Sequence, residues 1–260
     1  MTGLIAAIYR HPVKGFTPER LDRAELAAGR NFPCDRIYAV ENGPSGFDPA
    51  DPQFIPKQKF AVLAAIPQVA QARTAYEEAS GILRAEAPGQ PTFEAALTEP
   101  AGRGAFAAWL ATLLGEAARG PLKVLPTGGG HAFMDHPQGH VSVINLASVR
   151  DLEGRLGRVL DPARFRANVY VEGWPPWAEL DWTGRDIALG PVRGQVFKSI
   201  VRCAATHVDP ATAVRDIEVT KALFDAYGHM HCGIYLNVTR GGAIAVGDAC
   251  AEPAAKEVCG

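Results

Sequence analysis

The sequence contains few cysteines, and no two of them are close neighbours. The five are Cys34, Cys203, Cys232, Cys250 and Cys259, an odd number scattered over 260 residues. The sequence therefore lacks a CxxC redox pair and the paired cysteines of a structural zinc site, and it does not suggest a disulfide framework. These absences indicate a reducing compartment, and we expect a cytoplasmic protein.

The sequence also lacks a charge excess and a long apolar run. Its 26 Lys and Arg residues nearly balance 28 Asp and Glu residues, for a net charge of −2. Any anion-binding site must therefore be local, and we expect no nucleic-acid partner. The longest apolar stretches, Phe60–Ala65 and Ala105–Leu114, are too short to span a bilayer. No basic segment precedes the apolar run Leu4–Ile8, so we expect neither a signal peptide nor a membrane partner.

Several widespread catalytic motifs are missing as well. The sequence contains no P-loop, no GxGxxG, no GxSxG and no HExxH. Its composition, 47% hydrophobic and 21% charged, is that of a globular protein with enough chain for one large domain or two small ones. Fold and function must therefore be sought in hydrophobic periodicity and in local clusters of polar residues.

The first hundred residues predict short strands separated by turns, which favours a small barrel or sandwich. Residues 42–56 are rich in Gly, Pro, Asp and Ser and predict a surface loop. Between Ala105 and Ala118 the apolar residues recur at helical spacing, which predicts a helix that bridges the two halves. The runs of strand length are Leu4–Tyr9, Leu21–Leu26, Ile37–Val40, Phe60–Ile66 and Ile82–Ala87.

The second half predicts a β-rich domain with two helices. Asn145 is suited to cap a helix that Gly157 ends. Phe165–Val171 alternates with period two, which predicts a strand with Arg166 and Asn168 on one face. The other predicted elements are a helix over Val219–Tyr227, strands at 122–125, 141–144, 187–189 and 192–201, and a hairpin formed by Ile234–Val238 and Ile244–Val246.

One cysteine lies directly after a predicted strand. Arg202 and Cys203 follow the run Val192–Val201, and the chain then turns through Thr206 and Asp209. A thiol beside a cation favours the thiolate, which is both a nucleophile and a ligand for soft metals. A buried structural cysteine is the alternative, since free cysteines are among the most buried residues. This segment alone leaves both interpretations open.

Four further residues are candidates for binding a phosphate or a polar ring. Lys14, Arg36, Arg166 and Asn168 carry cations or an amide on or beside short strands and turns. For each of them, solvated surface polarity is the alternative. We predict that Lys14, Arg36 and Arg166 converge in one cleft, because a bound phosphate needs several charge-assisted hydrogen bonds. The helix start at Asn145 offers free N–H groups to an anion, as every helix start does.

Histidines form another candidate site. His229-Met230-His231-Cys232, with His131, His136 and His140 upstream, contains ligand types that bind zinc or copper. The spacing matches no structural zinc pattern, and solvated loop histidines are the alternative.

The order of several motifs resembles the MOSC domain family. They are Phe165-Arg166-Ala167-Asn168-Val169, Trp177-Ala178-Glu179, Arg202-Cys203-Ala204-Ala205-Thr206 with Val208-Asp209-Pro210, and Ile244-Ala245-Val246-Gly247-Asp248. Upstream, Tyr9-Arg10-His11-Pro12-Val13-Lys14-Gly15 and Asp35-Arg36 resemble the β-barrel domain that precedes MOSC in the amidoxime-reducing component family. The resemblance covers nearly the whole chain.

The resemblance implies an α+β, mostly β fold. It implies two β-barrel-like domains, an N-terminal β-barrel and a MOSC β-barrel, with a few helices between and around them. We place the N-terminal domain with its bridging helix at 1–125, the MOSC domain at 126–250 and a C-terminal tail at 251–260. We expect Cys250 and Cys259 to belong to a polar tail.

The resemblance also implies a molybdenum–pterin (molybdopterin) cofactor between the two domains. Its metal would be bound by Cys203, which we expect to be the only cysteine that matters for chemistry. A dithiolene-bound molybdenum is soft enough to favour such a thiolate. Gly15 stands where the family often has Ser, and Ala167 where it often has Pro. By the matching positions, the pterin and its phosphate would be bound by Lys14, Gly15 and Arg36 from one side and by Arg166, Asn168 and Arg202 from the other, with Asn145 nearby.

The activity that the resemblance implies is the reduction of N-hydroxylated small molecules, such as amidoximes or hydroxylamines, by a molybdenum-dependent oxidoreductase. We expect Cys203 and Asp209 to be the catalytic residues. Asp209 and His207 are candidates for proton delivery. The sequence has no flavin, haem or iron–sulfur motif, so we expect a separate electron-transfer protein. The alternatives are a molybdenum cofactor or sulfur carrier without turnover, and a structural β-protein with an inert Cys203. The chain is too short for a desulfurase domain, so we expect no pyridoxal phosphate, and we expect a monomer.

Overall fold

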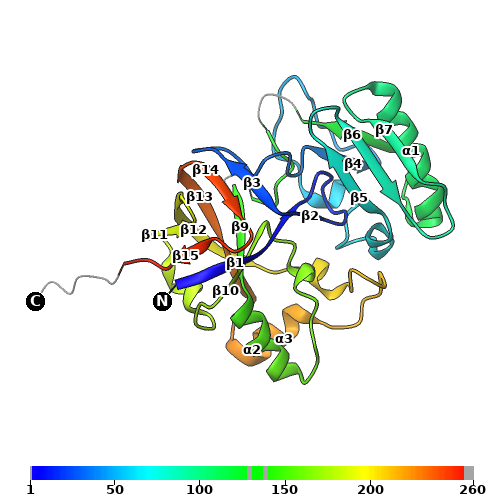
Figure 1. Ribbon diagram of the computed structural model, residues 1–260. Helices are drawn as coiled ribbons and strands as arrows, with labels where there is room; N and C mark the ends of the chain where they lie inside the picture. Colours follow the sequence, from blue (N-terminus) through cyan, green and yellow to red (C-terminus); the bar gives the residue numbers. More distant parts are fainter. Residues whose placement is uncertain (1, 128–130, 137–139, 255–260) are drawn as a thin grey trace, which may run out of the picture.

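The computed structural model describes residues 2–127, 131–136 and 140–254. Strands predominate, and a closed barrel with two helices packed near one end lies beside a smaller layer of strands and one long helix (Figure 1). The predicted fold class, mostly β with few helices, is confirmed. The division of the chain at residue 125 stays a prediction.

Seven strands close the barrel within the described ranges. Their order is β10, β9, β13, β12, β11, β15 and β1, and β1 pairs back onto β10. Only the pairing of β9 with β10 is parallel. The bounds are β1 (Thr2–Arg10), β9 (Val141–Asn145), β10 (Val169–Glu172), β11 (Asp186–Leu189), β12 (Val192–Val201), β13 (His231–Arg240) and β15 (Ala249–Ala251).

The first strand of the chain thus belongs to the barrel built by the second half. Ile5 and Ile8 of β1 are fully buried and pack with Val169 and Val171 of β10 in the barrel core. Buried and exposed positions alternate over the first four residues of β1, as on a strand with one face toward a core. The smaller half is therefore tied to the barrel through the chain that follows β1.

The smaller half is a set of short sheets covered by helix α1 (Pro100–Leu114). This helix buries Phe106, Leu110 and Leu114 against β7 and β8. The predicted helix is confirmed, although it begins earlier than Ala105, with Pro100 in its first turn, and ends at Leu114. It does not bridge the two halves, because it packs within the smaller one. The remaining strands are β2 (Glu19–Leu21), β3 (Arg23–Leu26), β4 (Tyr38–Asn42), β5 (Arg73–Glu77), β6 (Ile82–Glu86), β7 (Phe93–Ala96), β8 (Leu122–Pro126) and β14 (Gly242–Ala245).

The two helices beside the barrel have the predicted ends. Helix α2 (Leu146–Leu156) is capped by Asn145, whose side chain accepts a hydrogen bond from the Ala147 N–H at 3.0 Å. Gly157 ends it in the left-handed conformation, and Gly228 does the same for α3 (Val219–Tyr227). Both predictions are confirmed.

The predicted strand over Phe165–Val171 is wrong in its first part. A 3-10 helix, η4 (Pro162–Phe165), begins after Asp161, whose side chain accepts from the Ala163 N–H. Arg166 then has a φ of 52°, and the strand starts only at Val169. Local hydrogen bonding at Asp161 and Pro162 thus overrides the alternation, and Arg166 and Asn168 do not share a strand face.

Three other predictions are also wrong. The predicted hairpin does not form, because β14 pairs with β3 while β13 pairs with β12 and β9. Phe60–Ile66 contains a turn rather than a strand, and three of its residues, Val62, Leu63 and Ala64, line the cavity described below. Cys250 is fully buried in β15 rather than part of a tail, and Cys259 lies outside the described residues.

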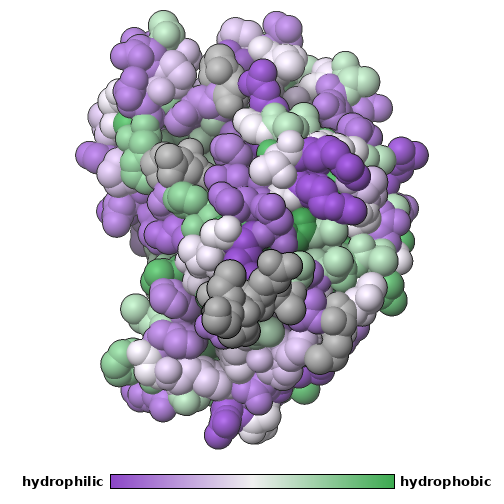
Figure 2. Space-filling view, turned by 90° about the vertical axis from the view of Figure 1, so that its left-hand side faces the viewer, coloured by the Kyte–Doolittle hydropathy of each residue, from purple (hydrophilic) through white to green (hydrophobic). Residues whose placement is uncertain are grey.

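The outer surface is mainly hydrophilic on the face shown in Figure 2, where hydrophobic residues lie scattered among polar ones. None of the helices in the described ranges combines the length and the apolar character needed to cross a bilayer.

Candidate functional site

A cavity lies between the smaller half and the barrel, and both contribute to its wall. Lys14, Arg36 and Arg166 line it together, so their predicted convergence is confirmed. Gly15, Arg202 and Cys203, also predicted as site residues, line it as well. His136, a member of the candidate histidine site, lines it too, and the further polar lining residues that the sequence analysis did not select include Lys57, Asp135, Ser142, Arg164, Lys198 and Tyr235.

Lys14 is held on a turn that follows β1. Its backbone N–H donates to the Tyr38 carbonyl at 2.8 Å. Its Nζ donates to the Phe133 carbonyl at 2.8 Å and pairs with Asp135 Oδ1 at 2.6 Å. Burial lowers the pKa of Lys14, and Asp135 partly opposes that shift. Asp135, whose side chain is half exposed, therefore occupies a position where a bound anion would compete for Lys14.

Gly15 follows with a φ of 88°, a conformation that favours glycine. A Cβ at this position would lie 2.7 Å from the Cα of Val62. Val62, in the segment 60–66, lies too close to Gly15 for the serine side chain that the family often has at this position.

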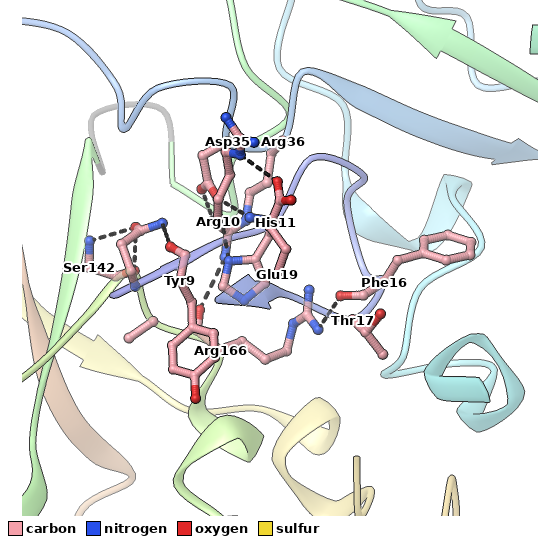
Figure 3. A network of polar contacts seen from close by, with 12 residues as sticks. Tyr9, Arg10, His11, Phe16, Thr17, Glu19, Asp35, Arg36, Ser142 and Arg166 are labelled. Atoms are coloured by element: carbon pink, nitrogen blue, oxygen red, sulfur yellow. Dashed lines mark hydrogen bonds and ion pairs between the residues drawn. The ribbon is translucent and has the colours of Figure 1, made fainter. Parts of the chain in front are cut away.

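Arg36 is oriented by a buried network with Asp35 and His11 (Figure 3). Its Nη1 donates to Asp35 Oδ2, and its Nη2 donates to the Arg166 carbonyl at 3.2 Å. Asp35 also accepts from the His11 N–H at 2.6 Å. Burial would raise the pKa of Asp35, but Arg36 and His11 hold it below its usual range. Arg36 is therefore fixed by a carboxylate behind it while it faces the cavity.

Arg166 reaches across from the barrel half to the smaller half. Its Nη1 donates to the Phe16 carbonyl at 2.6 Å (Figure 3). Its buried Nη2 has no hydrogen-bond partner among the described residues. Burial and the charge of Arg36 lower the pKa of Arg166 to about 10, so it stays a cation at neutral pH. A buried cationic donor without an acceptor is suited to an anionic ligand.

Cys203 is half-buried and follows β12 at the cavity wall. Its carbonyl accepts from the Thr206 N–H at 3.0 Å and from the Thr206 hydroxyl at 2.9 Å, which explains the threonine in this motif. Lys57 lies beside Cys203. Burial would lower the pKa of Lys57, but the charge of Cys203 and a hydrogen bond with it raise that pKa.

Arg202 fixes the strand end on the other side of Cys203. Its Nε donates to the Cys232 carbonyl at 2.7 Å and its Nη1 to the Phe165 carbonyl at 2.7 Å. The guanidinium also lies over the Phe165 ring, 5.4 Å from its centroid. Arg202 therefore joins β12, β13 and the segment that carries Arg166.

Two predicted cofactor-binding residues do not line the cavity. Asn145 is fully buried, and its side chain amide donates to the Pro175 carbonyl at 2.7 Å and to Glu179 at 2.8 Å. Asn168 is also fully buried, and its Oδ1 accepts from the N–H and the hydroxyl of Ser142. Both residues hold the barrel together, and Asn168 also positions Ser142 in the cavity wall.

The two candidates for proton delivery also lie outside the cavity lining. Asp209 pairs with Arg164 at 2.8 Å and accepts from the N–H groups of Ala211 and Thr212, which makes it the centre of a turn. Burial would raise its pKa, but the two N–H groups and Arg164 lower it. His207 shares a 2.8 Å hydrogen bond with Thr220. The structure therefore gives both residues positions that support the loop after Cys203.

The histidines do not assemble into a metal site in the described ranges. No three His, Cys, Asp or Glu side chains there are grouped to hold a metal ion. His229 and His231 stack with ring centroids 5.3 Å apart. His136 alone of the histidines lines the cavity, beside the rings of Phe197 and Tyr235.

Sequence analysis missed the polar cavity residues that come from loops and strand faces without a motif. Lys57 lies in a short 3-10 helix, η1 (Lys57–Lys59). In the sequence, two lysines so close together resemble ordinary solvent-exposed surface residues. Lys198 alternates with apolar residues in β12, as an exposed strand residue does. Asp135 is the only acidic residue between His131 and His140. A single carboxylate among histidines could have marked it as a candidate site residue.

The family models confirm what the motif order indicated. The model of the MOSC N-terminal beta barrel domain matches residues 2–113, and that of the MOSC domain matches residues 130–251. The chain therefore belongs to the MOSC domain proteins that carry the N-terminal beta barrel domain.

Among curated proteins, mitochondrial amidoxime-reducing component 1 from mouse (Mus musculus) is 32% identical over 118 residues, 41% of this chain and 34% of that protein. Its human (Homo sapiens) counterpart is 32% identical over 72 residues, 28% of this chain and 21% of that protein. The chain thus matches about a third or less of the length of these relatives. Among solved structures, the YUAD protein from Bacillus subtilis aligns over 96% of this chain and 94% of its own, with 15% identity and a TM-score of 0.47.

Proposed function

We propose that the cavity binds a molybdenum–pterin cofactor and that the protein is an oxidoreductase for N-hydroxylated compounds. The observation that carries this proposal is the convergence of Lys14, Arg36 and Arg166 from both halves on a cavity that also contains the half-buried thiol of Cys203. The family assignment and the likeness to amidoxime-reducing component 1 support it.

The residues present fit such a group. The unpartnered Nη2 of Arg166 needs an anionic acceptor, and Lys14 has a half-exposed carboxylate that a phosphate can displace. Cys203 supplies the thiolate that a soft metal favours, and Thr206 fixes the backbone that presents it. Lys14, Arg36 and Arg166 would hold the phosphate and pterin, and Cys203 would bind the metal.

When bound, the cofactor supplies two-electron transfer and accepts oxygen, while the protein provides binding and orientation. Reduction of an N–OH group to N–H consumes two electrons and two protons and releases water. The electrons would come from a separate redox protein. The network of His11, Asp35 and Arg36 keeps the Arg36 guanidinium at a fixed position, so this group needs little reorganisation when the anionic cofactor enters.

The test is the reduction of benzamidoxime by the purified protein with a chemical electron donor. We expect turnover in the wild type and its loss in Cys203→Ser, in which a poorly acidic hydroxyl replaces the thiolate. Turnover in Cys203→Ser equal to that of the wild type would contradict the proposal. Molybdenum and pterin in a protein that reduces no N-hydroxylated compound would favour the alternative, a cofactor or sulfur carrier.

A further inference from the structure

Two lysines at the cavity differ from its other cations. Lys57 comes from η1 in the smaller half and Lys198 from β12 in the barrel, and both side chains line the cavity. Lys57 is half-buried and Lys198 is exposed. Neither has a carboxylate or carbonyl hydrogen-bond partner among the described residues, although Lys57 is hydrogen-bonded to Cys203. Lys198 is therefore a cation whose charge is available to a ligand, and the charge of Lys57 becomes available where Cys203 binds a metal.

Each inner cation, in contrast, already has at least one acceptor, and all of them except the partly exposed Arg166 are buried. The Nη2 of Arg166 has no acceptor among the described residues. Lys14 pairs with Asp135, and Arg36 pairs with Asp35. Arg164, 2% exposed, pairs with both Asp209 and Asp216. The other two inner cations donate to backbone carbonyl groups of the protein: Arg202 to those of Cys232 and Phe165, and Arg166 to that of Phe16.

The positions of the two lysines place them where a substrate would lie. Lys57 is adjacent to Cys203, the residue at which the reaction would occur. Lys198 is the cross-strand partner of Tyr235, whose side chain also lines the cavity. The rings of His136 and Phe197 are near Tyr235 and Lys198, with the His136 and Tyr235 centroids 6.2 Å apart. Lys198 thus lies beside an aromatic part of the wall, and Lys57 lies beside Cys203.

Among the residues that the structure describes, one carboxylate lines the cavity, that of Asp135, and it is paired with Lys14. We propose that Lys57 and Lys198 form a subsite for an anionic substituent of the substrate, so that the preferred N-hydroxylated compound carries a carboxylate or phosphate group beside an aromatic or apolar body. This inference rests on the proposed function and names its substrate class. A cationic substrate would meet two like charges there, one of which, Lys198, has no ion-pair partner among the described residues.

The first test compares two substrates that differ in one charge. We would measure kcat/KM for 4-carboxybenzamidoxime and for benzamidoxime, and take their ratio in each variant. The ratio is expected to fall about tenfold in Lys57→Met and in Lys198→Met, since each variant loses one charge-assisted contact. A phosphonate analogue measured in parallel distinguishes a carboxylate site from a phosphate site.

Lys59→Met is the matched control, because Lys59 lies in the same 3-10 helix and does not line the cavity. Its ratio should equal that of the wild type. A reversal variant, Lys198→Glu, should raise the ratio of kcat/KM for a trimethylammonium-bearing benzamidoxime to that for benzamidoxime. Equal ratios in wild type, Lys57→Met and Lys198→Met would overturn the inference.

The second test needs no turnover. Calorimetry would measure binding of 4-carboxybenzamidoxime, without an electron donor, to the purified protein at about 0.02 M and about 0.2 M salt, since exposed charges are screened at the higher value. Affinity should fall with salt and fall about tenfold in Lys57→Met. Lysine-dependent binding without any N-reduction would refute the proposed function alone. N-reduction with a charge-independent affinity would refute this inference alone.

Discussion

At the scale of single residues, Gly15 stands at a point in the cavity wall that leaves no room for a side chain. Its φ is 88°, and a Cβ would lie 2.7 Å from the Val62 Cα. We predict that Gly15→Ser, although it introduces the residue common in the family, lowers the free energy of unfolding by about 2 kcal/mol or more. Urea denaturation followed by circular dichroism measures this.

Gly43→Ser is the control for that prediction. Gly43 has a similar φ of 84°, but no atom lies within 4 Å of a Cβ built there. It therefore reports the cost of the backbone conformation alone. The packing argument fails if Gly15→Ser is no less stable than Gly43→Ser.

His11 gives the protein a predictable dependence of stability on pH. Burial and the charge of Arg36 lower its pKa from 6.5 to about 3. Below about pH 6.5 the unfolded chain binds a proton at His11, whereas the native state does so only near pH 3. The free energy of unfolding should therefore fall as pH decreases through this window, by at most about 1.4 kcal/mol per pH unit from this residue.

The comparison with His11→Asn isolates this effect. Asn cannot be protonated, so between about pH 6.5 and about pH 5, where most carboxylates are ionised, its stability should vary less with pH than that of the wild type. The measurement is urea denaturation at several pH values. Identical slopes for the two proteins would show that His11 is charged in the native state.

At the scale of elements, the sequence predicted a helix end correctly where one interaction between neighbouring residues determines that end. Asn145 and Gly157 fixed the ends of α2, because capping involves neighbouring residues alone. The predictions failed where long-range packing decides. The segment 60–66 is apolar because it packs under Gly15 and Phe133, and β14 pairs with β3 from the other end of the chain. Alternation in a short segment contains no information about such partners.

The candidate site follows the same rule. Lys14, Arg36, Arg166 and Cys203 stand in motifs, and the structure brings them to one cavity. Asn168 belongs to the same motif as Arg166, but its side chain hydrogen-bonds to Ser142 within the barrel. A motif does not show which of its residues contact a ligand and which hold the surrounding structure. Lys57 and Lys198 have no motif, so only the assembled cavity identifies them.

Strand β1 provides a test at this scale, because it closes a barrel whose other six strands lie beyond residue 140. We predict that residues 126–260 alone do not unfold cooperatively, since β10 and β15 would lose their shared partner and expose the core that Ile5 and Ile8 cover. Thermal unfolding by circular dichroism checks this.

A rearranged chain makes that prediction sharper. Thr2 is the antiparallel partner of Ala251, so a short Gly-rich turn can connect β15 to β1. Residues 126–251 followed by such a turn and residues 2–10 should recover cooperative unfolding. Cooperative unfolding of 126–260 without β1 would contradict the importance of barrel closure.

At the scale of the whole molecule, the charges are distributed unevenly. The net charge is −2, yet in the described part of the chain seven cationic side chains and a single carboxylate line the cavity. The near balance of charge over the chain therefore conceals a local positive field between the two halves. Both halves contribute to it, so a fully formed anion site requires the complete fold.

The measurement that tests the central claim most directly is the molybdenum and pterin content of the purified protein, produced in a host that makes the cofactor. Elemental analysis and fluorescence of the oxidised pterin would be applied to the wild type, Cys203→Ser and Cys232→Ser. We predict about one molybdenum and one pterin per chain in the wild type and in Cys232→Ser, and loss of molybdenum in Cys203→Ser. A wild type without molybdenum and pterin, or metal lost in Cys232→Ser and kept in Cys203→Ser, would contradict the account.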